Sequence, residues 1–175
     1  NTAQPDPVSG EPGSATHYHQ AVSAAQVAVD TETGRVQVLN VQAATFAGVM
    51  INPTLCELQL EGTMFMGMGQ ALFEEVVHDA GTLVNASLAD YTIPAFSDSP
   101  AQAGAILLED REAGEVHGIG ENVMPAVPPA IANAVAACQI GRRARNHARR
   151  QRRTVELRYA TIDAVSLMTR TAIIG

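Results

Sequence analysis

The sequence predicts an α+β domain in which a mixed β-sheet packs with two principal helices. Three observations predict this class: two runs of alternating apolar residues around a short polar turn, two later stretches with helical features and proline in the first turn, and short strand-like runs between them. Strands, helix, strands and helix therefore follow one another, as in α+β domains. With 175 residues, 46% of them hydrophobic, the chain can form one domain or one large fragment of something bigger.

The first expected element is a β-hairpin. Apolar and polar residues alternate over residues 25–29 and again over residues 35–41, which is the pattern of half-buried strands. Between the two runs lies Asp30-Thr31-Glu32-Thr33-Gly34, a short polar turn in which Gly34 can adopt a positive φ. The two runs are therefore expected to pair with each other.

A helix is expected over residues 54–75, with Asn52 as its N-cap and Pro53 in its first turn. Its apolar residues fit one helix face, although Gly62, Gly67 and Gly69 each cost about 1 kcal/mol relative to alanine in a helix interior. Glycines in a helix that forms anyway usually indicate that another helix or a ligand approaches the backbone closely.

The remaining expected elements are a turn at 79–81, a short strand at 82–85, an extended segment at 90–96, a buried strand at 104–109 and a last helix at 130–138. Pro94 places the extended segment at a sheet edge or bends it, because proline cannot donate a ladder hydrogen bond. Pro128-Pro129 suits the first turn of the last helix. No apolar run is long enough to predict a membrane span. Cys56 and Cys138 lie far apart in apolar helical sequence and are expected to be buried free thiols.

Charge divides the chain unevenly. All 11 basic residues are arginine, and nine of them lie in residues 142–175, which carry a net charge of +7, whereas residues 1–141 carry −14. We therefore expect a loop or linker at 1–16, which is rich in Pro, Gly and Ser, an α+β segment at 17–141 and an Arg-rich divergent tail at 142–175. Docking to another subunit or sequence drift explains the tail better than nucleic-acid binding, since the acidic remainder would repel phosphate.

The sharpest local motif is Gly118-Ile119-Gly120-Glu121, a carboxylate directly after a G-x-G turn. Two glycines let a backbone lie close to a bulky ligand and present N–H groups to it. A carboxylate held beside that ligand could serve as a general base. On its own the motif is weak, because an acid after a turn is most often solvated.

Read in order, several motifs together resemble the molybdenum hydroxylases, which comprise xanthine dehydrogenases, aldehyde oxidoreductases and aerobic carbon monoxide dehydrogenases. The resemblance is to the C-terminal part of the molybdopterin-binding large subunit and runs from about Val27 to Gly141. The motifs are Val27-Ala28-Val29-Asp30 with Thr33-Gly34-Arg35-Val36, then Asn52-Pro53 with Gln59, Gly62 and residues 67–75, Asp90-Tyr91-Thr92-Ile93-Pro94, Gly118-Ile119-Gly120-Glu121 and Ala130-Ile131-Ala132-Asn133-Ala134-Val135. Five weak motifs in the same order at compatible spacing make a specific pattern.

The resemblance implies roles for individual residues. Glu121 falls on the family's catalytic glutamate, which acts as general base. Gln59 falls on a glutamine that hydrogen-bonds the pterin, and Gly118, Ile119 and Gly120 fall on the turn whose backbone lies against the cofactor. No side chain of this chain is expected to bind a metal ion directly. Gly62 and Gly67 would pack beside the cofactor.

The chain also departs from the family pattern. His117 stands where lysine is common, Phe46 where an aspartate is expected, Leu58 where a glycine is expected and Thr63 where a second small residue is usual. After Gly141 the family's proline-containing ending is replaced by the arginine run.

The implied protein is a molybdenum-dependent oxidoreductase that hydroxylates an aldehyde or N-heterocycle with water as the oxygen source, active only with the rest of its complex. Its cofactor would be molybdenum–molybdopterin in the cytosine dinucleotide form, with 2Fe-2S and FAD on partner chains. The expected partners are the remaining large-subunit segment, the iron–sulfur and flavin subunits and a small-molecule substrate, with no nucleic acid. The alternatives are a catalytically silent structural or interaction subunit of the same fold, or part of a CO dehydrogenase. The expected location is the cytoplasm, with the periplasm as the alternative.

Overall fold

The computed structural model describes Val8 and residues 19–30, 32–112, 114–149 and 159–171, and from residue 139 onward it describes the backbone alone. Apart from Val8, the linker expected at residues 1–16 lies outside these ranges. Among the described residues, no helix is both long and apolar enough to cross a membrane.

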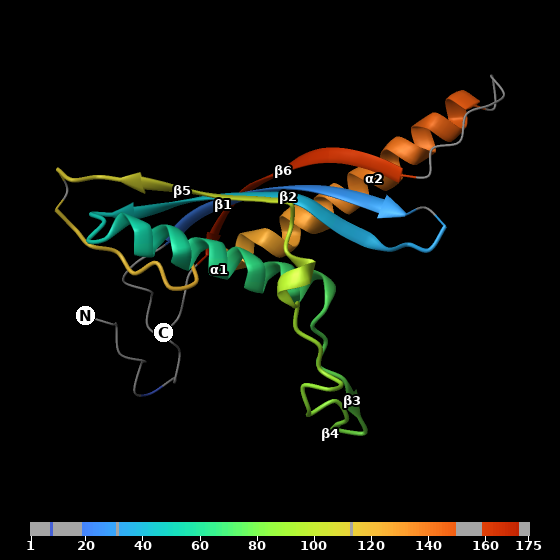
Figure 1. Ribbon diagram of the computed structural model, residues 1–175, viewed down its shortest axis with the longest axis horizontal. Coiled ribbons are helices and arrows are strands. Elements are labelled where there is room, and N and C mark those ends of the chain that lie inside the picture. Colours follow the sequence, from blue (N-terminus) through green and yellow to red (C-terminus); the bar gives the residue numbers. More distant parts are fainter. Residues whose placement is uncertain (1–7, 9–18, 31, 113, 150–158, 172–175) are drawn as a thin grey trace.

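A four-stranded mixed sheet forms the centre of the molecule (Figure 1), with strand order β5-β2-β1-β6. The strands are β1 (His19–Asp30), β2 (Val36–Gly48), β5 (Gln102–Glu109) and β6 (Tyr159–Thr171). β1 pairs antiparallel with β2 and with β6, whereas β2 and β5 run parallel. The predicted hairpin is confirmed: β1 and β2 are joined by a turn in which Gly34 has φ +78° and its N–H donates to the Asp30 carbonyl.

The two predicted helices are present and lie on one face of the sheet. They are α1 (Pro53–Leu72) and α2 (Val127–Arg149), and the short 3-10 helix η2 (Met124–Ala126) leads into α2. Asn52 caps α1 as expected, since its side-chain oxygen accepts from the Leu55 N–H at 3.2 Å. The core between helices and sheet consists of small and medium apolar side chains, among them Val27, Val41, Leu60, Met64, Met68, Val127, Ile131 and Cys138. The predicted α+β class with two packed helices is therefore confirmed.

Gly67 lies in close contact with the start of α2 and with η2. A Cβ atom at this position would stand 2.7 Å from the Val127 Cβ and 2.9 Å from the Met124 carbonyl oxygen. Of the two explanations left open for the glycines of α1, helix packing thus applies to Gly67, and its expected place beside a cofactor stays a prediction. Gly62 differs, because a Cβ there would meet no atom within 4 Å.

An extended arm leaves the end of α1 and carries the two-residue strands β3 (His78–Asp79) and β4 (Thr82–Leu83) away from the sheet (Figure 1). The edge or bent strand expected at residues 90–96 is wrong: Asp90 and Tyr91 lie in a turn and a bend, residues 92–95 belong to no strand, and the 3-10 helix η1 (Phe96–Asp98) follows. Its polar groups bind the end of α1 instead of a neighbouring strand. The Tyr91 hydroxyl donates to Glu74 at 2.6 Å, and the Thr92 hydroxyl donates to the Phe73 carbonyl at 3.1 Å.

Regular structure continues beyond Gly141, where the α+β segment was expected to end: α2 extends past this residue, and β6 lies wholly after it. The backbone of α2 continues to Arg149, beyond the helix expected at 130–138, and β6 pairs with β1 along most of its length. The division of the chain into a linker, a segment and a tail stays a prediction. Both cysteines are free; Cys138 is buried, as expected, whereas Cys56 is half-buried.

Candidate functional site

The predicted catalytic loop begins where the chain returns to the end of β2. The Val49 N–H donates to the Glu115 carbonyl at 2.7 Å, and the His117 N–H donates to the Ala47 carbonyl at 3.3 Å. Gly48 permits this approach, because its φ is +64° and a Cβ at this position would collide with the Glu115 carbonyl oxygen. The loop that follows is therefore tied to the sheet by backbone contacts.

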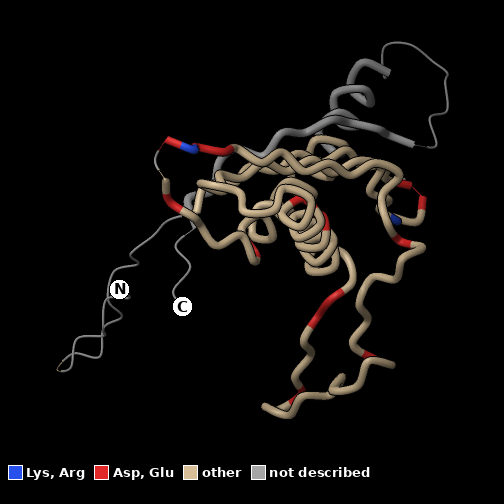
Figure 2. Tube along the Cα trace, turned by 60° about the vertical axis from the view of Figure 1, so that its left-hand side comes forward, with Lys and Arg blue, Asp and Glu red and all other residues tan. Residues whose placement is uncertain are grey.

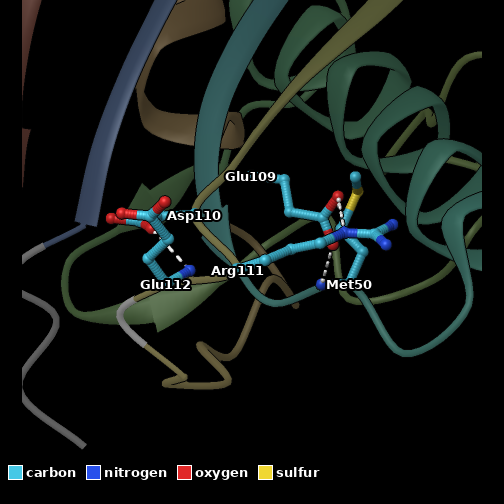
Figure 3. A network of polar contacts seen from close by, with 5 residues as sticks. All are labelled: Met50, Glu109, Asp110, Arg111 and Glu112. Atoms are coloured by element: carbon cyan, nitrogen blue, oxygen red, sulfur yellow. Dashed lines mark hydrogen bonds and ion pairs between the residues drawn. The ribbon is translucent and has the colours of Figure 1, made fainter.

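A second tie fixes the strand end beside this loop (Figure 3). Glu109, the last residue of β5, accepts the Met50 N–H at 3.2 Å, and its other oxygen lies 2.9 Å from the Arg111 Nε. The hydrogen bond from Arg111 holds the pKa of the Glu109 carboxyl below its usual range; partial desolvation opposes this shift and the Met50 amide adds to it. Next to this pair, the Asp110 carboxylate accepts the Glu112 N–H at 3.0 Å and shapes the turn.

Gln59 on α1 and Gly120 on the loop are brought together by a direct hydrogen bond. The Gln59 side-chain Nε2 donates to the Gly120 carbonyl oxygen at 2.7 Å, across 61 residues of sequence. Two segments that were each predicted to bind one cofactor thus meet at one place. The Gln59 amide also has an acceptor oxygen, which gives it the hydrogen-bonding capacity that a heterocycle edge requires.

Asn122 ties the same loop to the sheet, and sequence reasoning missed it. Its side chain is only 4% exposed. Its Nδ2 donates to the Gly118 carbonyl at 3.1 Å and lies 3.5 Å from the hydroxyl oxygen of Thr45 on β2. The Thr45 hydroxyl in turn donates to the Gln20 carbonyl on β1 at 2.9 Å. The only signal in the sequence is an amide placed directly before the apolar run that opens η2.

The loop itself faces open space. A Cβ atom at Gly118 or at Gly120 would meet no atom within 4 Å, and neither glycine has a positive φ. The Glu121 side chain is exposed. Ile119 points the other way and packs, half-buried, against the core. A ligand could therefore reach the backbone of this turn and the Glu121 carboxylate, while Ile119 anchors the turn.

Two departures from the family pattern contact each other beside the loop. The rings of Phe46 on β2 and His117 pack edge to face with their centroids 5.1 Å apart. The His117 Nε2 also lies 3.3 Å from a Glu115 carboxylate oxygen. Leu58, a third departure, is 57% exposed and immediately precedes Gln59 in α1. These side chains border the candidate site without entering the core.

Two cavities formed by the described residues lie away from the loop. One, of about 780 Å³, is lined by residues near the β1–β2 turn, by the end of α1 and by Ser97, Asp98 and Ser99. Another, of about 280 Å³, lies between α1, Val41, Ala103 and the segment 96–100. Gln59 and the residues 118–121 line neither of these two cavities, and apart from the half-buried Ile119 they are exposed. Among the described residues, no three His, Cys, Asp or Glu side chains gather as metal ligands.

A family model for the molybdopterin cofactor-binding domain matches residues 2–100, more than half of the sequence. The chain belongs to this molybdopterin cofactor-binding family, and the resemblance indicated by its motifs is confirmed. The match includes Gln59 but ends before the loop at Gly118, and it assigns no role to a single residue, so the roles of all predicted site residues remain predictions.

Individual relatives agree with this family. The molybdenum-binding subunit of aldehyde oxidoreductase from Escherichia coli K12 is 39% identical over 116 residues, which are 63% of this chain and 16% of that subunit. The xanthine dehydrogenase molybdenum-binding subunit from Escherichia coli O157:H7 is 37% identical over 112 residues, 61% of this chain and 15% of that one. The chain thus spans about one sixth of the length of these relatives.

Solved structures show the same fold. Quinoline 2-oxidoreductase from Pseudomonas putida 86 superposes with a TM-score of 0.59 at 35% identity, over 66% of this chain and 15% of that one. CO dehydrogenase from Oligotropha carboxidovorans superposes with a TM-score of 0.57 over 65% of this chain and 15% of that one, and at 23% identity this likeness concerns the fold alone.

Proposed function

We propose that the chain is the molybdopterin-binding segment of the large subunit of a molybdenum hydroxylase, which oxidises an aldehyde or N-heterocycle with water as the oxygen source and uses Glu121 as general base. The observation that carries the proposal is the hydrogen bond from Gln59 to the Gly120 carbonyl. It joins the two segments expected to hold the cofactor, in a chain whose relatives include aldehyde oxidoreductase and nicotine 6-hydroxylase subunits.

The residues present fit the implied cofactor. The free space at Gly118 and Gly120 would let a flat group approach the turn backbone, which any larger side chain at these positions would obstruct. Gln59 would contribute its amide, and the backbone of residues 118–120 would line one side. When bound, molybdenum–molybdopterin, in its cytosine dinucleotide form, would supply the electron sink and the activated water.

The chain's own chemical contribution is a placed proton acceptor. Glu121 follows a turn that Gln59 and Asn122 hold through two different carbonyl groups, so its carboxylate projects from a fixed backbone. Its side chain is exposed on this chain, and the remaining segment of the large subunit would exclude water from it. A carboxylate so positioned can accept the proton released as water attacks the substrate carbon.

The partners follow from the same proposal. The relatives include a nicotine 6-hydroxylase large subunit and subunit gamma of a 6-hydroxypseudooxynicotine dehydrogenase complex, both from Paenarthrobacter nicotinovorans. We expect this chain to work with the remaining large-subunit segment and with chains that carry 2Fe-2S and FAD, in the cytoplasm, with the periplasm as the alternative.

A catalytically silent subunit of the same fold is the second candidate. The contact between Phe46 and His117 favours it, because both are departures from the family pattern and lie where the loop leaves the sheet. A packing change at this place could move the turn away from the position that catalysis requires.

Glu121→Gln separates the two candidates in the assembled enzyme. The substitution keeps the shape of the side chain and removes its basicity, so turnover should fall by roughly 10²–10⁴-fold while molybdenum and pterin are retained. The matched control is Glu32→Gln, an exposed acid in the turn at the far end of β2, which should behave as wild type. Normal turnover of Glu121→Gln would contradict its role as base, and absence of turnover in a cofactor-loaded wild type would favour the silent subunit.

A further inference from the structure

We infer that Asn122 is a positioning residue that sets the place of the loop carrying Glu121. Its contribution to turnover rests on the proposed function, since Glu121 is the base there, whereas its hold on the loop rests on contacts of this chain alone. Asn122 follows Glu121 directly, so any shift of its backbone moves the carboxylate.

The amide of Asn122 bridges the loop and the sheet. One N–H group donates to the Gly118 carbonyl, at the start of the turn, and the same nitrogen lies 3.5 Å from the Thr45 hydroxyl oxygen on β2. Thr45 is itself buried and donates to the Gln20 carbonyl on β1. The chain of contacts thus extends from the turn through Asn122 to two central strands of the sheet.

Burial makes this choice of side chain specific. At 4% exposure, Asn122 has little access to water, so its amide depends on the Gly118 carbonyl and the Thr45 hydroxyl for its hydrogen bonds. An aspartate has nearly the same shape, but its oxygens would face the carbonyl and the hydroxyl oxygen without a proton to donate to the carbonyl. Aspartate should therefore release the loop without removing volume from the core.

Gln59 adds a second hydrogen bond to the loop. Its side chain donates from α1 to the Gly120 carbonyl, whereas the side chain of Asn122 donates to the Gly118 carbonyl. Glu121 comes directly after the second of these two held carbonyls. Gln59 is exposed, so a cofactor could compete for its amide, but Asn122 is buried and keeps its hold whether or not a ligand is present.

The test compares Asn122→Asp with Asn133→Asp in the assembled large subunit. Asn133 is exposed on α2, so the same isosteric change there serves as a matched control. Amide hydrogen exchange is measured over residues 117–124 and over β1 and β2, together with kcat and KM. Asn122→Ala, which adds no charge to the buried site, is the second variant and decides the outcome if aspartate prevents assembly.

We expect exchange over residues 117–124 to rise at least about tenfold in both Asn122 variants, with exchange over β1 and β2 unchanged. The kcat should fall by about tenfold or more while KM changes little, because a displaced base stabilises the transition state less and leaves substrate binding unchanged. Asn133→Asp should match wild type in every measurement.

Three results would overturn the inference: loop exchange and kcat close to wild type in both variants, exchange that rises equally over the loop and the two strands, or loss of assembly in both variants while Asn133→Asp assembles. The last two would mean that Asn122 supports the whole fold rather than the loop. A wild-type assembly without molybdenum and pterin would refute the proposed function, and the exchange measurement would still decide the role of Asn122.

Discussion

Gln59 and Glu121 were single positions in motifs that are each weak, and the structure brings their segments together. The residues of the turn could be predicted from the sequence because glycine, which has no side chain, often stands where the backbone must stay accessible. The open space at Gly118 and Gly120 agrees with this. Their roles toward a cofactor stay predictions. The order of the motifs along the chain predicted which segment carries the site, because the family has the same motifs in the same order.

Asn122 could not be predicted in the same way. An asparagine has no distinctive spacing, and its importance depends on its burial and on the Thr45 hydroxyl of β2 that it reaches, both of which arise only when the loop packs against the sheet. The contact between Phe46 and His117 was equally hidden, since 71 residues separate the two rings in sequence.

Acid should weaken the structure at the end of β5. The pKa of Glu109 lies below its usual range because Arg111 and the Met50 amide stabilise the carboxylate. A lowered folded-state pKa means that this stabilisation is complete above the pKa of the unfolded chain and is lost as pH falls through the folded-state value. Arg111→Ala should therefore raise the pKa of Glu109 toward its usual value. The free energy of unfolding should then depend less on pH in the acid range in which Glu109 takes up its proton.

NMR titration of the Glu109 carboxyl carbon measures this directly. Arg35→Ala is the control, because Arg35 lies in the β1–β2 turn, away from Glu109. An unchanged Glu109 titration in Arg111→Ala would show that the ion pair is not the cause of the shift.

At the scale of elements, the local sequence pattern predicted those helices and strands that local sequence determines. The hairpin, α1 and β5 follow from alternation, capping and a short apolar run. The prediction of a strand at residues 90–96 was wrong because the sequence could not show that this segment would bind the end of α1 rather than a neighbouring strand. The length of α2 and the pairing of β6 with β1 were not predicted either, because the resemblance on which the segment was defined ends at Gly141.

Two glycines of α1 should respond oppositely to alanine. Gly62→Ala gains helix propensity without a steric clash and should raise the free energy of unfolding by about 1 kcal/mol. Gly67→Ala forces a Cβ against Val127 and the Met124 carbonyl and should lower the free energy of unfolding by about 1–3 kcal/mol. Denaturant unfolding of both variants checks this pair; equal effects of the same sign would contradict the assignment of Gly67 to helix packing.

At the scale of the whole molecule, the coloured part of the chain in Figure 2 is acidic, with many Asp and Glu positions and few Arg positions. Its candidate site is a surface turn, and the chain spans about one sixth of the length of its curated relatives. The remaining large-subunit segment would therefore have to close the site. Turnover should be undetectable with this chain alone and should appear only when the remaining subunits are supplied, which an activity assay of the separated and combined components measures.

The most direct test of the account is the molybdenum and pterin content of the assembled protein in wild type and in Gly120→Val. Valine at this position meets no atom of the chain within 4 Å of its Cβ, so the melting temperature should hold, but its side chain would fill the space assigned to the cofactor. We predict equimolar molybdenum and pterin in wild type and a large loss of both in Gly120→Val at unchanged stability. Wild type without the cofactor, or a fully loaded Gly120→Val, would contradict the account.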